Sequence, residues 1–269
     1  MTPAVPALAF TRTGSGAPLV LLHGLGSSRA AWDPVVPALA ERFEVIAVDL
    51  PGFGDSDPLP PAVIASPAAL AASVAALLDG LGLDAAHLVG NSLGGWVALE
   101  LAQLRPTASV TLLSPAGLWR AGAPRYGLLS LRLSRWLAEH AARPLRWVVG
   151  SRVGRTLVLG QTHGRPWRMD ADRARLVLHA MASCPGFAAA LEATAAQHIS
   201  AQSVEAPVTV AFGTRDWLLL KRQSRRLDQL PATVRVRELR GCGHVPMTDD
   251  PAEVVDVVTE ASRRVVEVG

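Results

Sequence analysis

Residues 86–99 read Ala86-His87-Leu88-Val89-Gly90-Asn91-Ser92-Leu93-Gly94-Gly95-Trp96-Val97-Ala98-Leu99. A short apolar run precedes Ser92, and apolar residues at helical spacing follow it, so the stretch predicts a buried strand, a sharp turn and a helix. Gly90 and Gly94 bracket the serine, and glycines at these two positions let the strand and the helix approach closely. The pattern therefore predicts that Ser92 is presented at the tip of a strained turn.

Strands and helices alternate on both sides of this turn. Apolar runs predict further strands at residues 18–22, 43–48, 109–113, 207–212 and 233–239. Residues 5–11 are expected to form a hairpin with 18–22, and Ser66 with Pro67 is expected to start a helix that reaches Leu81. Alternation of this kind predicts an α/β fold with a mostly parallel central sheet flanked by helices.

The alternation stops between Ser114 and Ala206, where a helical pattern is broken by prolines. We therefore predict a core of residues 1–114 and 207–269 with an inserted helical cap of residues 115–206. The cap has twelve arginines, namely Arg120, Arg125, Arg132, Arg135, Arg143, Arg146, Arg152, Arg155, Arg165, Arg168, Arg173 and Arg175. Its five acidic residues are Glu139, Asp170, Asp172, Glu192 and Glu205.

Four tryptophans, Trp119, Trp136, Trp147 and Trp167, are interleaved with these arginines. One interpretation is a pocket roof that meets an acyl chain, an aromatic group or a carboxylate. The other is a solvated arginine face whose tryptophans pack the cap onto the core.

The composition excludes several classes of protein. With 269 residues, 49% hydrophobic content and mean hydropathy +0.26, the chain has ample sequence for one large core. No signal-peptide pattern opens the chain and no apolar run reaches the ~18 residues of a membrane span, so we expect a cytoplasmic protein. The spacing of Cys184 and Cys242 suggests neither a disulfide framework nor a zinc site. A net charge of +3 is too small an excess to indicate nucleic-acid binding.

A nucleophilic serine needs a base that takes its proton and a third group that orients the base. Asp216 follows the strand at residues 207–212, and His244 follows the strand at residues 233–239. Both positions lie at the carboxyl end of the predicted sheet, where open α/β sheets build their sites. We therefore expect Ser92, His244 and Asp216 to act together as nucleophile, base and orienting acid.

With these residues in the order Ser, Asp, His, the chain resembles the α/β-hydrolase fold superfamily, and the resemblance covers nearly all of it outside the cap. It implies hydrolysis through an acyl-enzyme. His23-Gly24-Leu25 matches the family's oxyanion loop, which implies that the backbone N–H groups of Leu25 and Leu93 hold the oxyanion. The loop at residues 49–56 also matches the family, and we expect it to shape the edge of the site.

No cofactor or metal is expected, because the Gly-x-Gly pairs lack a third glycine three positions later and no H-E-x-x-H pattern occurs. The favoured function is hydrolysis of carboxylic esters, with a small-molecule substrate that carries an apolar acyl or aryl group. Ser92 disfavours epoxide hydrolases and haloalkane dehalogenases, whose nucleophile is aspartate.

Two alternatives stay open. Gly90 to Gly95 is similar to carbon-carbon hydrolases of the meta-cleavage type, although Val245 stands where that family usually has a tryptophan after the catalytic histidine. A low-turnover ligand-binding or biosynthetic helper protein on the same fold is the other. The oligomeric state and the substrate are left open.

Overall fold

The computed structural model describes residues 6–120 and 122–263, and these form a seven-stranded sheet in the order β1-β3-β2-β4-β5-β6-β7. The strands are β1 (Phe10–Thr13), β2 (Ala17–Leu22), β3 (Phe43–Val48), β4 (Ala86–Asn91), β5 (Thr107–Leu113), β6 (Val208–Gly213) and β7 (Arg235–Leu239). β1 is antiparallel to β3, and every other neighbouring pair is parallel. The expected mostly parallel sheet is confirmed.

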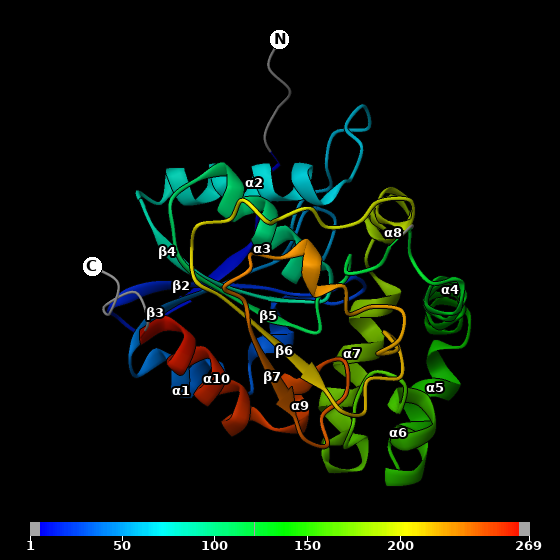
Figure 1. Ribbon diagram of the computed structural model, residues 1–269. Coiled ribbons are helices and arrows are strands. Elements are labelled where there is room, and N and C mark those ends of the chain that lie inside the picture. Colours follow the sequence, from blue (N-terminus) through cyan, green and yellow to red (C-terminus); the bar gives the residue numbers. More distant parts are fainter. Residues whose placement is uncertain (1–5, 121, 264–269) are drawn as a thin grey trace.

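Helices cover both faces of the sheet (Figure 1). α2 (Pro67–Gly80) and α3 (Leu93–Leu104) lie on one face, while α1 (Val36–Ala40) and α10 (Pro251–Arg263) lie on the other. Successive residues of β2 point to opposite faces, so Val20 and Leu22 join the core under α2 and α3, whereas Leu19 and Leu21 join the core under α1 and α10. Burial on both faces explains the nearly continuous apolar run of this strand.

The expected hairpin between residues 5–11 and 18–22 is wrong. β1 pairs with β3, where Phe10 lies opposite Val48 and Thr13 opposite Val45. β2 already has parallel neighbours on both sides, β3 and β4, so the free edge of β3 is the position left for β1. Residues 1–5 and 264–269, which belong to the predicted core unit, lie outside the described residues.

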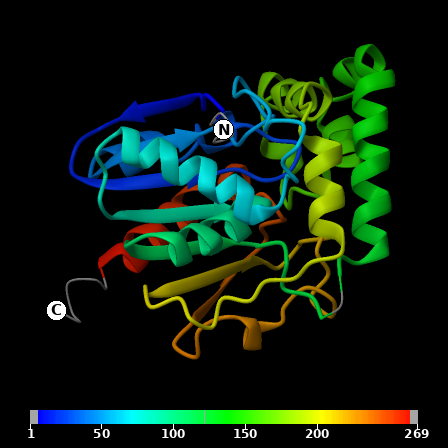
Figure 2. The same cartoon turned by 90° about the horizontal axis from the view of Figure 1, so that it is seen from above.

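Within the described residues between β5 and β6 there are five helices, beyond the carboxyl end of the sheet (Figures 1 and 2). They are α4 (Arg125–His140), α5 (Ala142–Val148), α6 (Arg152–Leu159), α7 (Ala171–Ala182) and α8 (Phe187–Ala195), with the short η2 (Pro166–Arg168) before α7. We call residues 115–206 the helical insertion. Val149, Leu159, Met169, Ala174 and Leu178 form a separate small core within it, while α8 contributes to the main core.

The remaining short elements are η1 (Arg29–Trp32), η3 (Leu227–Gln229) and α9 (Pro246–Asp249). Within the described ranges, no single helix is long and apolar enough to cross a membrane. α7 and α8 meet that criterion only as a pair, which is bent by 74°.

Candidate active site

The turn between β4 and α3 holds Ser92 in a strained conformation. Its φ is 54° and its ψ is −116°, outside the regions that residues with a side chain normally occupy. A Cβ on Gly90 would lie 2.2 Å from the carbonyl oxygen of Gly94, and one on Gly94 would lie 2.1 Å from that of Leu22. The two glycines are therefore needed for strand and helix to meet here, as the sequence predicts.

His244 and Asp216 form a buried pair at the same edge of the sheet. His244 Nδ1 lies 2.9 Å from Asp216 Oδ2, and both side chains are at most 4% exposed. Asp216 Oδ1 accepts hydrogen bonds from the backbone N–H groups of Leu218 and Leu219, at 3.0 and 2.8 Å. Burial raises the pKa of Asp216, but the charge and hydrogen bond of His244 and these two N–H groups outweigh it, so the pKa lies below its ordinary value. Asp216 is thus ionised, and its carboxylate contacts one nitrogen of the imidazole.

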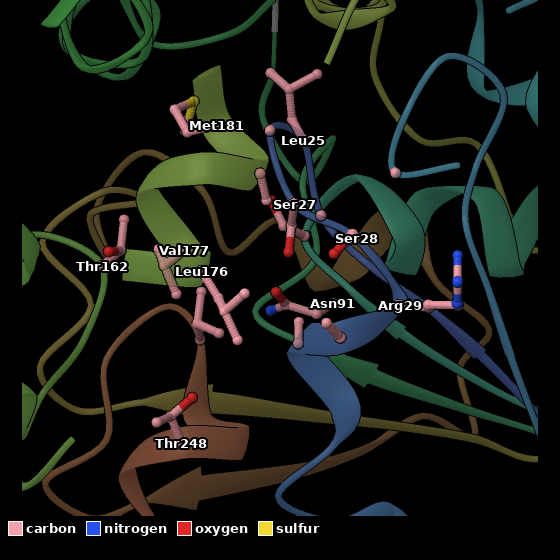
Figure 3. Close-up of a pocket in the computed structure, with 18 of the residues that line it drawn as sticks. Leu25, Ser27, Ser28, Arg29, Asn91, Thr162, Leu176, Val177, Met181 and Thr248 are labelled. Atoms are coloured by element: carbon pink, nitrogen blue, oxygen red, sulfur yellow. The ribbon is translucent and has the colours of Figure 1, made fainter. Parts of the chain in front are cut away.

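The other nitrogen of His244, Nε2, is buried and has no hydrogen-bond partner among the described residues. Ser92 and His244 both line a cavity of about 460 Å³, which Figure 3 shows from close by. The structure thus joins His244 to Asp216 and brings Ser92 to the same cavity, but it forms no hydrogen bond between Ser92 and His244. Such bonds often tighten only when substrate is bound.

The loop that follows β2 runs against the serine turn. A Cβ on Gly24 would lie 3.1 Å from Ser92 Cβ. Leu25 lines the cavity, and Leu25 and Leu93 both line a smaller apolar pocket that also touches Ser92. Across the described ranges, neither the Leu25 N–H nor the Leu93 N–H donates a hydrogen bond. The loops after β2 and β4 flank the point where the strand order reverses, which is where open α/β sheets bind ligands.

Asn91 and Asp249 form hydrogen bonds to the loop that carries His244, and neither residue was predicted from the sequence. Asn91 Nδ2 donates to the carbonyl oxygens of His244 and Leu113, at 2.8 and 2.9 Å. Asp249 is buried and accepts a hydrogen bond from the N–H of Gly243, next to His244, at 2.7 Å. The contact from Asn91 to His244 spans 153 positions, so a polar residue within an apolar strand was the only signal in the sequence.

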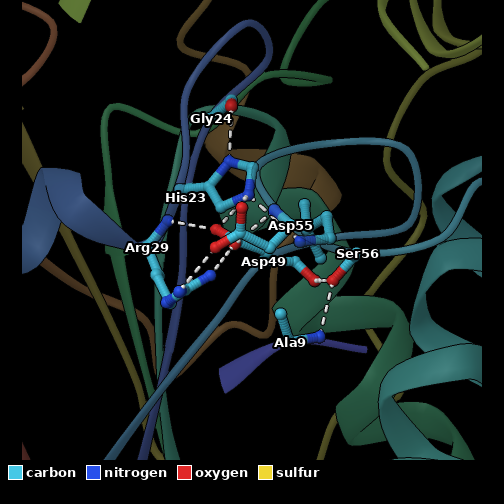
Figure 4. A network of polar contacts seen from close by, with 8 residues as sticks. Ala9, His23, Gly24, Arg29, Asp49, Asp55 and Ser56 are labelled. Atoms are coloured by element: carbon cyan, nitrogen blue, oxygen red, sulfur yellow. Dashed lines mark hydrogen bonds and ion pairs between the residues drawn. The ribbon is translucent and has the colours of Figure 1, made fainter. Parts of the chain in front are cut away.

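The loop at residues 49–56 is fixed by ion pairs (Figure 4). Asp49 is fully buried and accepts hydrogen bonds from the backbone N–H and the guanidinium of Arg29. The N–H of Asp55 donates to Asp49 Oδ2 at 3.0 Å, and the Asp55 carboxylate pairs with Arg29 at 2.7 Å. Asp55 therefore helps to hold the guanidinium that neutralises Asp49.

The His23 side chain fixes the loop that carries Leu25. His23 Nδ1 lies 2.8 Å from the carbonyl oxygen of Gly24, and His23 Nε2 accepts a hydrogen bond from the N–H of Leu50 at 3.0 Å. Burial lowers the pKa of His23, so the ring is neutral, with the proton on Nδ1. This side chain ties the loop after β2 to the loop after β3.

Most charged and aromatic residues of the helical insertion lie away from the cavity. Arg173 is its one arginine among the residues that line the cavity, and Arg173 Nη1 pairs with Asp33 at 2.9 Å. Trp136, Trp147 and Trp167 are 54%, 83% and 39% exposed. The expectation that the tryptophans pack the cap onto the core is therefore wrong for these three. The fourth, Trp119, is buried and lines the smaller pocket.

Known proteins resemble this chain over most of its length. It is 31% identical over 262 residues to the pimeloyl-acyl-carrier-protein methyl ester esterase of Aeromonas hydrophila, covering 92% of this chain and 96% of that protein. It is 30% identical over 207 residues to an epoxide hydrolase of Mycobacterium tuberculosis, covering 72% of this chain and 94% of that one. The structure of a thermophilic esterase from Thermogutta terrifontis superposes with a TM-score of 0.79 at 24% identity, covering 98% of this chain and 96% of that chain. The model of the alpha/beta hydrolase fold family matches residues 17–251, and the chain belongs to that family.

Proposed function

We propose that the protein is a cofactor-independent serine hydrolase that cleaves neutral carboxylic esters. One observation carries the proposal: the imidazole of His244 is bound to an ionised Asp216 through one nitrogen, while its other nitrogen is unpartnered in the wall of a cavity that also contains Ser92. Similarity to an esterase over nearly the full chain supports it.

Each group then has one task. His244 Nε2 takes the proton of Ser92 Oγ as this oxygen attacks the ester carbonyl carbon. The N–H groups of Leu25 and Leu93 hold the tetrahedral oxyanion. The ester C–O bond breaks as His244 returns the proton to the leaving alcohol, which leaves an acyl group on Ser92. Water then gives a proton to His244 and attacks the acyl carbon. The bond from this carbon to Ser92 Oγ breaks as His244 returns the proton to Oγ, and the acid is released.

The cavity favours a neutral, apolar acyl group. Leu131 from α4 lines it, as do Leu176, Val177 and Met181 from α7, which Figure 3 labels. We therefore propose that the helical insertion acts as a cap over the acyl chain. These aliphatic and thioether side chains offer apolar surface and no charge to a bound ligand.

The charges of the cavity separate this function from carbon-carbon hydrolysis. A meta-cleavage substrate carries a carboxylate, which needs an unpaired cation. The two arginines among the cavity-lining residues are both paired, Arg29 with Asp49 and Asp55 and Arg173 with Asp33. Val245, which follows His244 where meta-cleavage hydrolases usually have a tryptophan, also favours ester hydrolysis. A ligand-binding helper protein would need neither a strained serine nor a histidine paired with an aspartate in the wall of one cavity.

Labelling and turnover test the proposal together. A fluorophosphonate probe should label the wild type at Ser92 and leave Ser92→Ala unlabelled. Neutral p-nitrophenyl esters should be cleaved with kcat/KM at least about tenfold above that for any vinylogous diketo acid, a gap of about 1.4 kcal/mol. Faster turnover of the diketo acid would make carbon-carbon hydrolysis the function, and labelling without turnover of any substrate would favour the helper protein.

A further inference from the structure

Helices α4, α5 and α6 expose large apolar side chains. On α4, Tyr126, Leu129, Leu133 and Trp136 recur at the spacing of one helix face, and all four are exposed. Two further exposed residues, Trp147 and Leu157, lie on α5 and α6 and are 83% and 79% exposed. Large apolar side chains exposed to water on neighbouring helices are typical of a site of interaction.

Unpaired arginines accompany these side chains. Arg125, Arg132, Arg143, Arg146 and Arg152 are exposed, and none of them forms an ion pair or side-chain hydrogen bond within residues 6–120 and 122–263. On α4, Arg125 and Arg132 lie within about 40° of Trp136 around the helix axis. We call these arginines and the six apolar residues above the arginine-apolar face.

The helices that carry the arginine-apolar face lie on the outer side of the helical insertion, away from the sheet. In Figure 2 the green helix α4 is the outermost helix at the right of the view, and in Figure 1 α4, α5 and α6 follow one another down the right-hand side. The inner side of α4 contributes Leu128 and Leu131 to the walls of the two pockets. One helix thus carries the cavity wall on one side and this face on the other.

We propose that the arginine-apolar face docks on an anionic lipid surface. Aromatic and leucine side chains of such a helix enter the boundary between headgroups and acyl chains, while the arginines contact lipid phosphates. The degree of exposure favours lipid over an acidic protein. Trp147 and Leu157 protrude from the surface, and a fluid lipid boundary accommodates protruding side chains without a preformed complementary pocket. The proposal does not depend on the ester-hydrolase function.

Sedimentation with vesicles tests it on the full chain. The protein should pellet with phosphatidylcholine vesicles that contain about one-third phosphatidylglycerol, should stay in solution with phosphatidylcholine alone, and should be released at ~1 M salt. Each arginine near such a surface is worth about 1 kcal/mol, so Arg125→Gln/Arg132→Gln should lower the partition coefficient about 30-fold. Leu129→Ser should also weaken binding.

Matched variants control for charge and apolar content. Arg42→Gln/Arg222→Gln removes two exposed arginines that lie outside the helical insertion. Ile64→Ser removes an apolar side chain that is 73% exposed. Both should change the partition coefficient less than about twofold. Unchanged circular dichroism spectra and thermal unfolding midpoints will show that all variants are folded.

Three results would overturn the proposal. The first is no pelleting with anionic vesicles at low salt. The second is equal loss of binding in the control variants, because binding would then follow net charge alone. The third is a dimer in size-exclusion chromatography that Leu129→Ser dissociates, or capture by an acidic protein with no vesicle binding, because the face would then belong to a protein interface.

Discussion

The backbone strain at Ser92 leads to a prediction that separates stability from catalysis. Ser92→Ala and Ser92→Gly both lose the nucleophile, so both should lose turnover by at least about 10⁴-fold. Glycine tolerates a φ of 54°, whereas alanine does not, so Ser92→Gly should have an unfolding free energy about 1 kcal/mol above that of Ser92→Ala. Urea denaturation and ester assays check both. Turnover within tenfold of wild type in either variant would remove Ser92 from the mechanism.

Asp216 should contribute to orientation more than to chemistry. Asp216→Asn keeps the nucleophile and the base, so kcat/KM should fall by about 10³- to 10⁴-fold, less than in Ser92→Ala or His244→Ala. The folded-state pKa of Asp216 is lowered, so its stabilising contribution is complete above its unfolded pKa of about 3.9 and is lost as pH falls through the folded value. The difference in unfolding free energy between wild type and Asp216→Asn should therefore shrink as pH falls below about 4. A silent Asp216→Asn would mean that another acid orients His244.

Asp249 connects two elements that lie far apart in the sequence. Its carboxylate accepts hydrogen bonds from the N–H groups of Gly164 and Arg165, in the loop after α6, and of Gly243, in the loop after β7, each at 2.7 Å. In Asp249→Asn the amide NH₂ would face one of these donors, so the unfolding free energy should fall by about 3 kcal/mol. kcat/KM should fall with it, because the His244 loop loses its anchor.

Asp250, the residue after Asp249, provides a matched control. Asp250→Asn removes the ion pair with Arg165 but keeps an oxygen for the N–H of Glu253, so it should cost less than about 1 kcal/mol. Chemical denaturation and ester kinetics measure both variants. Equal losses in the two would show that the Asp249 contacts do not hold the loops together.

For the molecule as a whole, buried neutral histidines set the response to acid. Burial lowers the pKa of His23, His87 and His163. Below the ordinary histidine pKa of about 6.5, the unfolded chain therefore binds more protons than the folded one, and the unfolding free energy should fall as pH drops from about 6.5. Urea midpoints at several pH values measure the slope. The slope of the unfolding free energy against pH should be smaller in His163→Gln than in the wild type and unchanged in His140→Gln, which replaces an exposed histidine. The reverse order would show that the buried histidines do not cause the slope.

Local patterns were enough to predict strands β2 to β6 and the serine turn. The apolar runs of β2 to β6, the cap at Ser66 and the glycines around Ser92 are all set within a few residues, where periodicity and backbone sterics act. The positions of Asp216 and His244 at the sheet edge followed, because parallel strands bring their carboxyl ends together. The roles of these residues and of the Leu25 and Leu93 N–H groups are still predictions.

Only the tertiary structure decided which groups meet. β1 pairs with β3 because β2 has no free edge, and Arg29 and Arg173 are neutralised by carboxylates that lie 20 and 140 positions away. The exposure of Trp136 likewise depends on how α4 packs. Helical and strand periodicity acts between near neighbours in the chain and can be read there, whereas ion pairing and burial depend on surfaces that exist only after the elements have packed.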